Sequence, residues 1–425
     1  MEMQNMDRRA LLKGGGAAFA GLTVLRVAGP AHAFPGEPGE EEVIPWLDQP
    51  PDPPPGVILP NLLKWEQLDS WRTPANNFFV VSHYNEPALK AADWRLRIGG
   101  LVARPRSLTL AGLKARPRRE VDFTLECSGN TGLPFFIGGI GNARWAGTPL
   151  APLLRQAGVL KRGIEVVFWG DDAGKQTIRD NSGVLDPDGN GVVGPRGTGT
   201  VVPDGGGGLD LTITEQFARS MTLDDALNPE NLLCYEMNGR PLPREHGFPV
   251  RLIAPGWYGV ANVKWLTRIE VLDQQFRGNF MARDYVTIRE TRRGGKTVWT
   301  FANVRHDRLK SAPAKVTRRG DRYTIMGAAW GAPIAAVEVR IDDGPWMTAR
   351  LERQPSRGKR ARRFAWRFWT LRWKRPTAGE HAIRSRAFDA DGNVQPAPDN
   401  PYLASKVTYW ESDGQITRRV RIPGP

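Results

Sequence analysis

The amino-acid sequence predicts an α+β fold in which a mixed α/β domain precedes an all-β sandwich. Between residues 61 and 272, short runs of β-branched and aromatic residues alternate with short amphipathic patches, a pattern typical of mixed strands and helices. From 285 to 412, alternating apolar and polar residues are separated by turn residues, as in the strands of a sandwich. The 35 prolines and 47 glycines also favour a loop-rich fold over a helical bundle.

Residues 1–33 predict a twin-arginine export signal. Arg8 and Arg9 precede a weakly apolar run at 14–25, and an Ala-His-Ala cleavage pattern ends at Ala33. This signal implies a periplasmic protein that is exported after folding, often with a cofactor already inserted. Because the apolar run is shorter than the ~20 residues that cross a bilayer, we expect no stable membrane insertion. An uncleaved membrane anchor is the alternative.

Two domains follow a linker. Residues 34–60 are rich in Pro and Glu and predict a stiff, extended segment without a core of its own. The domain predicted over 61–272 contains strands at 121–125 and 164–168 and helices at 150–157 and 217–227. The sandwich predicted over 285–412 contains strands at 334–341, 364–368 and 381–387, with hairpin-type turns at 342–344 and 391–393.

A glycine-rich segment at 183–209 predicts an inserted surface loop. Residues 186–191 (DPDGNG) match the first half of a calcium-binding EF-hand loop. The glutamate that such a loop needs at its twelfth position is replaced by Gly197, and no flanking helices are evident. A calcium site and a plain polar turn both remain open for Asp186–Asn190.

Charge and cysteine content limit the function classes. The net charge is +14, and residues 350–375 hold 11 Lys and Arg against one acid, Glu352. This run predicts a solvated face, an acidic partner or an anionic ligand; nucleic acid is not expected, because no binding motif accompanies the charge. Two cysteines are too few for a disulfide framework, an iron–sulfur cluster or covalent haem attachment. A redox enzyme of this kind must therefore pass its electrons to another protein.

Cys127 is ambiguous when it is considered alone. It follows a β-rich run and enters a turn, which presents its side chain at a strand end. It could be a buried inert cysteine, a nucleophile that needs a histidine base, or a thiolate ligand to a soft metal. Cys234 lies in an apolar run and is expected to be packing only.

Several strings around Cys127 narrow these options. They are ECSGN at 126–130, ARWAG at 143–147, YEMNG at 235–239, PREHGFPVR at 243–251, PG at 255–256, VKWL at 263–266 and RDY at 283–285. In order and spacing they resemble the molybdenum-binding region of the sulfite oxidase family. The resemblance covers roughly residues 60–412, and its β-rich end resembles the immunoglobulin-like dimerisation domain of that family.

The resemblance implies a molybdenum–molybdopterin cofactor and a role for particular residues. Cys127 would be the protein ligand to the metal, Tyr285 the phenol at the mouth of the active site, and Trp145 a wall of the substrate pocket. The residues implied to contact the cofactor are His83, Asp172, His246, Arg251 and Lys264. Arg and Lys suit the dianionic phosphate of such a cofactor.

The implied activity is oxygen-atom transfer in an exported oxidoreductase, with sulfite or a related sulfur compound oxidised. Electrons would pass to a separate cytochrome c, since no haem is expected on this chain, and a homodimer would form through the sandwich. A molybdenum subunit of a sulfane dehydrogenase and a reductase of S- or N-oxides are alternatives. A non-catalytic exported binding protein is the alternative of another class, and it would contain no molybdenum.

The sequence departs from the family where a small dianion would bind. Sulfite-oxidising members carry arginine two residues before the histidine that corresponds to His83, where this chain has Val81. They carry another shortly after the cysteine, where this chain has Thr131 and Gly132. Each lost charge-assisted hydrogen bond is worth about 1.5–3 kcal/mol. If the substrate is sulfite, arginines from another part of the chain, such as the basic run at 350–375, would have to bind it. Otherwise the substrate is larger and less charged than sulfite. Phe135, Phe136 and Trp257 could accommodate such a substrate.

Overall fold

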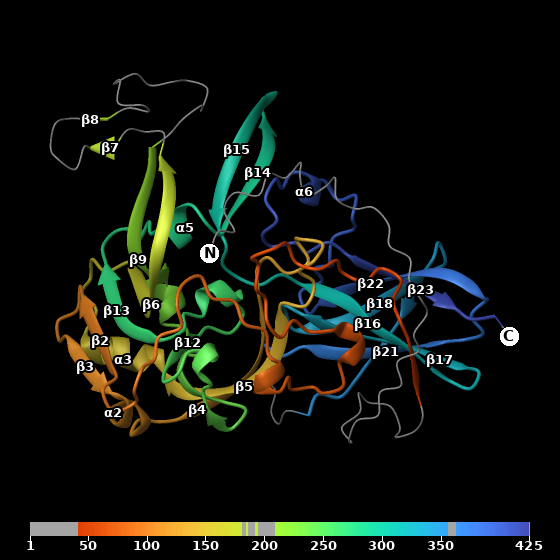
Figure 1. The fold of residues 1–425 in the computed structure, drawn as a ribbon, viewed down its shortest axis with the longest axis horizontal. Helices are drawn as coiled ribbons and strands as arrows, with labels where there is room; N and C mark the ends of the chain where they lie inside the picture. The colour runs from red at the N-terminus through yellow and green to blue at the C-terminus, as the bar shows by residue number, and fades with distance from the viewer. Residues whose placement is uncertain (1–40, 181–183, 186–191, 194–208, 356–362, 425) are drawn as a thin grey trace.

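The computed structural model describes residues 41–180, 184–185, 192–193, 209–355 and 363–424 (Figure 1). The predicted signal peptide, the calcium-loop resemblance at 186–191 and the middle of the basic run lie outside the described residues. Among the helices in the described ranges, none is both long enough and apolar enough to cross a bilayer.

Two five-stranded sheets build the part of the molecule that precedes residue 285 (Figure 1). The first sheet has the order β3 (Arg106–Thr109), β2 (Arg95–Gly100), β13 (Leu266–Leu272), β6 (Glu165–Asp180) and β9 (Leu209–Thr222). The second has the order β11 (Arg240–Pro241), β10 (Leu232–Met237), β5 (Ile140–Pro149) and β4 (Arg119–Glu126), and β12 (Arg251–Ile253) pairs with β10. The predicted strands at 121–125 and 164–168 lie within β4 and at the start of β6, which confirms both.

The helices of this part are short. They are α2 (Leu110–Lys114), α3 (Leu150–Ala157), α4 (Leu223–Ala226) and α5 (Asn279–Ala282), with 3-10 turns η1 (Trp65–Gln67), η2 (Ala75–Asn77), η4 (Arg244–His246) and η5 (Gly259–Ala261). α3 confirms the predicted helix at 150–157. Leu150, Leu153 and Leu154 bury one face of it in the core, and Gly158 ends it at a φ of 70°, which a residue without Cβ adopts without strain.

The helix predicted at 217–227 is wrong. Residues up to Thr222 continue strand β9, which pairs antiparallel with β6, and the helix is confined to Leu223–Ala226. Phe217 and Met221 lie four residues apart, as on one helix face, and both are buried. Pairing with β6 satisfies the backbone of this segment and overrides the local helical spacing.

The C-terminal part is a sandwich of two sheets (Figure 1). One sheet has the order β1 (Glu42–Ile44), β16 (Lys310–Arg319), β17 (Arg322–Trp330), β21 (Arg367–Trp373) and β20 (Arg350–Leu351). The other has the order β19 (Met347–Thr348), β18 (Ile334–Ile341), β22 (Gly379–Asp389) and β23 (Ile416–Ile422). Val316, Ile325, Val337 and Ile383 from the two sheets share one buried cluster, so the predicted all-β sandwich is confirmed.

Three further elements complete the fold. Strands β14 (Val286–Arg293) and β15 (Lys296–Asn303) form a hairpin that projects from the body in Figure 1, and α6 (Pro401–Ala404) lies beside it. Strands β7 (Val184–Leu185) and β8 (Val192–Val193) pair beyond the ends of β6 and β9.

The segment predicted as a linker joins the sandwich. Strand β1 pairs antiparallel with the edge of β16, with Val43 opposite Thr317. Trp46 is 2% exposed, and its indole N–H donates to the carbonyl of Ala314 at 2.9 Å. The segment therefore adopts a defined structure although it has no core of its own, because its side chains pack into the core of the sandwich.

The sandwich and the N-terminal part are joined by backbone contacts and shared packing. The strand predicted at 364–368 begins only at Arg367, because the residues before it contact β4 instead. The N–H of Thr124 donates to the carbonyl of Phe364 at 3.0 Å, and the N–H of Trp366 donates to the hydroxyl of Thr124 at 2.7 Å. Trp65 also stacks on Trp330 of the sandwich at 5.8 Å between ring centroids.

Candidate functional site

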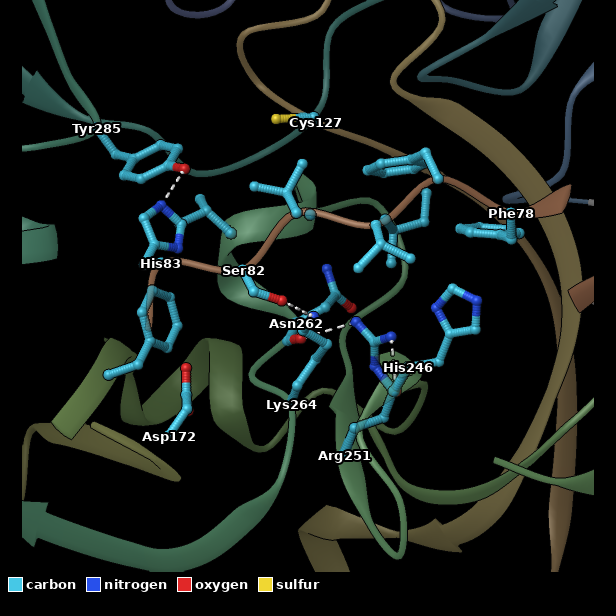
Figure 2. Close-up of a pocket in the computed structure, with 17 residues that line it drawn as sticks. Phe78, Ser82, His83, Cys127, Asp172, His246, Arg251, Asn262, Lys264 and Tyr285 are labelled. Carbon is cyan, nitrogen blue, oxygen red and sulfur yellow. Dashed lines mark hydrogen bonds between the residues drawn. The ribbon is translucent and has the colours of Figure 1, made fainter. Parts of the chain in front are cut away.

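A cavity of about 640 Å³, which opens partly to solvent, lies in the N-terminal part of the molecule. Figure 2 shows Cys127 at one end and Arg251 and Lys264 at the other, with the segment that carries Ser82 and His83 running between them. The cavity therefore has a thiol end and a basic end.

Cys127 occupies the thiol end, where strand β4 passes into a turn. Its side chain is 7% exposed, and its backbone is fixed on both sides. Its N–H donates to the carbonyl of Gly139 at 2.8 Å, and its carbonyl accepts from the N–H of Asn130 at 2.9 Å. Burial raises the pKa of the Cys127 thiol to about 12, so a nearby cation such as a metal ion is needed to ionise it at neutral pH.

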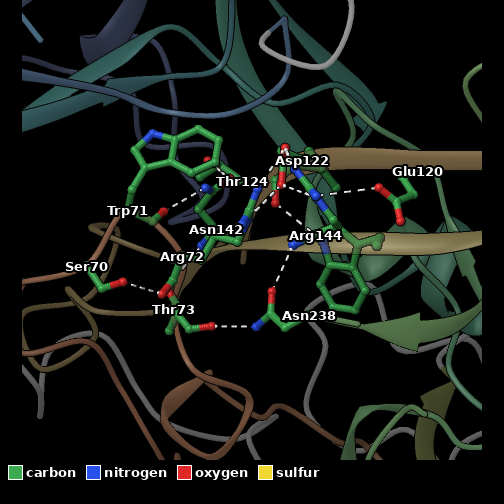
Figure 3. A network of polar contacts seen from close by, with 12 residues as sticks. Ser70, Trp71, Arg72, Thr73, Glu120, Asp122, Thr124, Asn142, Arg144 and Asn238 are labelled. Carbon is green, nitrogen blue, oxygen red and sulfur yellow. Dashed lines mark hydrogen bonds and ion pairs between the residues drawn. The ribbon is translucent and has the colours of Figure 1, made fainter. Parts of the chain in front are cut away.

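The segment at 68–83, which ends at His83, has no regular secondary structure apart from η2. A polar network anchors it to β4 and β5 (Figure 3). The carboxylate of Asp122 accepts from Arg72 at 2.9 Å and from Arg144 at 3.0 Å. The N–H of Thr73 donates to the carbonyl of Asn142 at 2.7 Å. Because Asp122 is 1% exposed, these bonds are poorly screened by water and hold the segment in place.

His83 and Tyr285 form a hydrogen-bonded pair near the thiol end. His83 Nε2 and the hydroxyl of Tyr285 are 2.7 Å apart, and the imidazole stacks on Phe217 at 5.2 Å between ring centroids. Burial, followed by the charge of Lys264, lowers the pKa of His83 to about 3, so the imidazole is neutral. Burial raises the pKa of Tyr285 well above its ordinary value, so the phenol is neutral too. One proton is therefore shared between two uncharged groups.

Arg251 lies at the basic end, at the first position of β12. It is 4% exposed, and its guanidinium donates to the carbonyls of His246 at 3.1 Å and Asn262 at 2.9 Å. Its Nε has no hydrogen-bond partner in the described structure. Burial lowers its pKa to about 10, which still leaves it charged at neutral pH. A buried cation bonded only to carbonyls is suited to binding an anion.

Lys264 and Asp172 complete this end. The Lys264 ammonium donates to the hydroxyl of Ser82 at 2.8 Å and the carbonyl of Glu245 at 2.9 Å. Burial, followed by the charge of Arg251, lowers the pKa of Lys264 to about 7. Burial also raises the pKa of Asp172 to about 7, and its Oδ1 has no partner among the described residues. Asp172 lies where β6 bulges away from β9, which points it at the cavity.

These groups fit an elongated ligand with different chemistry at its two ends. A thiol that can ionise only beside a cation suits a soft metal. A buried arginine and a lysine suit a phosphate or similar anion. The orphaned carboxylate oxygen of Asp172 and the free Nε–H of Arg251 leave one acceptor and one donor for the ligand. Neither histidine of the described cavity lining acts as a base for Cys127, because His83 bonds Tyr285 and His246 Nε2 donates to the carbonyl of Ala75 at 3.0 Å.

The structure brings together all the residues that the sequence placed at the site except Trp145. Those that line the cavity are His83, Cys127, Asp172, His246, Arg251, Lys264 and Tyr285. The expectation that Trp145 forms a wall of the substrate pocket is wrong, because its side chain is 0% exposed and does not line the cavity. Its indole donates to the carbonyl of Phe123 at 3.3 Å, and the Arg251 guanidinium lies 5.1 Å from the centre of its ring. It supports Arg251 from behind instead of contacting a substrate.

The residues that replace the expected arginines lie in different surroundings. Val81 lines the cavity, whereas Thr131 and Gly132 do not. The hydroxyl of Thr131 donates to the carbonyl of Ser412 at 3.1 Å. The described part of the basic run at 350–375 contributes no residue to the cavity lining, nor do Phe135, Phe136 and Trp257, which are buried.

Sequence reasoning missed several residues at the site. Ser82, Phe217 and Asn262 line the cavity, and Ser82 and Asn262 lie one and two residues from predicted site residues. In the sequence, only this proximity to predicted site residues could have indicated that Ser82 and Asn262 line the cavity. Trp410 stacks on Tyr285 at 4.2 Å between ring centroids, although 125 residues separate them, and no local pattern announces such a contact.

Comparisons with known proteins agree with this geometry. Residues 83–184 and 193–280 match the oxidoreductase molybdopterin binding domain, and residues 302–409 match the Mo-co oxidoreductase dimerisation domain. The sulfite oxidase of Gallus gallus is 31% identical over 350 residues, which is 76% of this chain and 68% of that protein. The mitochondrial sulfite oxidase of Drosophila melanogaster is 30% identical over 364 residues, 77% of this chain. The chain spans only 56% of that relative's length.

The fold is also similar to a solved structure, that of the sulfane dehydrogenase SoxCD from Paracoccus pantotrophus. The TM-score is 0.68 and the sequence identity is 23%, with 89% of this chain and 91% of that chain covered. This likeness concerns the fold, since the sequence identity is low.

Proposed function

Since this chain belongs to the sulfite oxidase family of molybdopterin-dependent oxidoreductases, we propose that it oxidises a sulfur compound by oxygen-atom transfer at molybdenum. The observation that supports this most directly is the division of the cavity into a thiol end at Cys127 and a basic end at Arg251 and Lys264. A molybdopterin carries a metal-binding group at one end and a phosphate at the other, so the two ends match its chemistry.

The chain's own residues have the following proposed roles. Cys127 ligates the metal through its thiolate, and bound molybdenum supplies the two-electron redox chemistry. Arg251, Lys264 and His246 bind the phosphate-bearing end. The unpartnered Oδ1 of Asp172 accepts an N–H from the pterin. These contacts fix the orientation of the cofactor relative to the substrate.

The pair formed by His83 and Tyr285 acts at the other end. Because both groups are neutral and share one proton across 2.7 Å, they present a hydrogen-bonding surface without net charge beside Cys127. In the tautomer in which His83 Nε2–H donates to the phenol oxygen, the phenol O–H is left to donate to an oxygen atom that gains negative charge during transfer. The surrounding rings of Phe217 and Phe280 keep bulk water away from this pair.

The cellular setting is also a proposal. The arginine pair at Arg8 and Arg9 supports export to the periplasm by the twin-arginine route. A separate cytochrome c is the proposed electron acceptor, and the net charge of +14 suits an acidic partner. The match to a dimerisation domain supports a homodimer formed through the sandwich.

The test is to purify the protein, quantify molybdenum and pterin per chain, and measure reduction of ferricyanide or cytochrome c with sulfur compounds. We expect near one molybdenum and one pterin per chain and turnover with at least one sulfur compound. A protein that folds in a cofactor-producing host but contains neither component would contradict the proposal and point to a binding protein.

A further inference from the structure

The cations that surround the thiol end are already bonded to protein groups. Arg219 donates to the carbonyls of Phe280 and Val304, although its Nε has no partner in the described structure, and Lys310 donates to the carboxylate of Glu126 at 2.6 Å. Arg308 pairs with Glu411 at 3.5 Å, and Lys406 donates to the carbonyl of Trp410 at 2.6 Å. None of these four cations lines the cavity. The described residues that line the cavity therefore offer a small dianion no Lys or Arg at this end.

A segment of the sandwich, Tyr409 to Ser412, lies against the turn that follows Cys127. The N–H of Glu411 donates to the carbonyl of Ser128 at 2.7 Å, and the carbonyl of Ser412 accepts from Thr131. The hydroxyl of Thr287 donates to the Glu411 carboxylate and fixes the same segment from the opposite side. These bonds hold the segment beside the metal-ligand turn.

This segment leaves no room for a side chain at Gly132. A Cβ at that position would lie 2.0 Å from the carbonyl oxygen of Tyr409, which is a backbone atom and cannot rotate away. An arginine at this position would therefore require the whole segment to move. The contact between the Tyr409–Ser412 segment and the turn after Cys127 thus excludes an arginine at position 132, and Gly132→Arg alone would not fit.

Uncharged groups occupy this end of the site. Val81 lines the cavity, and Tyr285 is stacked between the site and Trp410, at 4.2 Å between ring centroids. Tyr409 packs on Trp410 at 4.0 Å, and its ring edge lies 3.3 Å from a Cβ placed on Gly129. Burial raises the pKa of the Tyr409 phenol, so it carries no charge.

We propose that the reacting group of the substrate is an uncharged sulfur atom, as in a thioether, and that Val81 in the cavity, together with the Tyr409–Ser412 segment that excludes a side chain at Gly132, determines this specificity. The proposal rests on the proposed function, since it names the substrate class of the same site. Sulfite would lose most of the charge-assisted hydrogen bonds that a dianion needs. A neutral sulfur compound does not need these bonds and gains contact with Val81 and the ring of Tyr285, which line the cavity.

The reaction is balanced as an oxidation. The thioether sulfur forms one new bond to an oxygen atom that originates from water, and the two O–H bonds of that water break. Two electrons leave the sulfur and pass one at a time to two molecules of a one-electron acceptor, such as ferricyanide. Two protons are released to solvent.

The kinetic test compares methyl phenyl sulfide with sulfite, using metal-quantified holoenzyme and ferricyanide. We expect kcat/KM to be at least about 10-fold higher for the sulfide. Val81→Arg should reverse the order, because one restored charge-assisted bond is worth roughly 10- to 150-fold for the dianion. A wild-type preference for sulfite would overturn the inference while leaving molybdenum-dependent sulfur oxidation intact.

A binding test probes the same specificity without turnover. Intrinsic tryptophan fluorescence of the holoenzyme is titrated with methyl phenyl sulfone, which is neutral, and with sulfate. The sulfone should bind and sulfate should not, and Trp410→Leu should weaken sulfone binding about 10-fold. Trp299→Leu is the matched control, because Trp299 is 49% exposed on the β14–β15 hairpin, whereas Trp410 stacks on Tyr285, which lines the cavity. Preferential sulfate binding, or no binding of either compound, overturns the inference. Absence of molybdenum instead contradicts the proposed function.

Discussion

Lys310 and Glu126 form an ion pair at 2.6 Å in which neither side chain is exposed to solvent. Lys310 opens strand β16 of the sandwich, whereas Glu126 closes strand β4 and is followed directly by Cys127. The same carboxylate accepts from the indole of Trp330 at 2.8 Å and from the side-chain amide of Asn130 at 2.8 Å. The sandwich thus fixes the residue that precedes the proposed metal ligand.

Removing one partner of this pair should destabilise the protein strongly. Lys310→Met leaves the Glu126 carboxylate buried without its cation, which typically costs about 3–5 kcal/mol of unfolding free energy. The double variant Lys310→Met/Glu126→Gln should recover much of that loss, because it leaves no buried charge. Urea unfolding of the variants measures the difference, with the exposed Lys296→Met as control. Equal stability of the single variant and the wild type would show that the pair is not energetically coupled.

Cys127→Ser should abolish turnover, because a hydroxyl is a poor substitute for a thiolate on molybdenum. The loss should exceed about 100-fold even where the pterin is retained. Cys234→Ser is the matched control, because Cys234 is 0% exposed in the packed core and lies outside the cavity lining. Molybdenum content, pterin content and ferricyanide reduction are measured on both variants. Wild-type-like turnover in Cys127→Ser would remove the ligand assignment.

Arg251→Gln should lower cofactor retention. It deletes the buried cation and the unpartnered Nε–H that we assign to the phosphate, and each charge-assisted bond contributes roughly 1.5–3 kcal/mol. We therefore expect the affinity for the cofactor to fall by about 10- to 150-fold, seen as less pterin and molybdenum per purified chain. Arg268→Gln, at a partly exposed arginine over Trp169, should keep its cofactor. Unchanged content in Arg251→Gln would place the phosphate elsewhere.

The cofactor-free protein should become more stable as the pH rises from 7 to 9. Burial lowers the pKa of Lys264 from 10.5 to about 7, so between about pH 7 and pH 10.5 the unfolded chain binds a proton that the folded chain lacks. Stability therefore falls as the pH is lowered, and the loss is complete below about pH 7. Lys264→Met removes this contribution, so the difference in urea midpoint between the two proteins should change across this window. Parallel pH profiles would contradict the assignment.

The segment before residue 61 should contribute to the stability of the sandwich. Trp46 is 2% exposed and bonds Ala314, so Trp46→Ala should cost about 3–5 kcal/mol of unfolding free energy. Leu47→Ala is the neighbouring control, because Leu47 is 45% exposed. Thermal unfolding of both variants measures the effect. A Trp46→Ala variant as stable as the control would mean that the segment behaves as the free linker suggested by its composition.

The sequence predicted those features that depend on local patterns. The helix at 150–157 has a regular apolar face and a glycine at its end, and the structure matches it residue for residue. Cys127, His246 and Arg251 lie in distinctive strings, and all three line the cavity. The helix is capped by its own glycine, whereas the three site residues were identified because their strings resemble those of a known family.

The predictions failed where distant strands decide the outcome. Phe217 has helical spacing but lies in strand β9, which pairs with β6, and Trp145 lies in a motif but is covered on all sides. The contact between Gly132 and Tyr409 joins segments that no local pattern relates. The sequence shows that glycine stands at position 132 where the family carries arginine, but it does not show that the Tyr409 carbonyl leaves no room for a side chain there.

The position of Tyr409 and Ser412 near the end of the fold has a consequence for biosynthesis. The turn after Cys127 receives its final contacts only from this segment, which is made after nearly all of the sandwich has been translated. A ribosome-bound chain that has reached residue 300 carries every cofactor-binding residue, yet its metal-ligand turn is still uncovered. The finished form of the turn therefore exists only once the chain has been synthesised at least to residue 412.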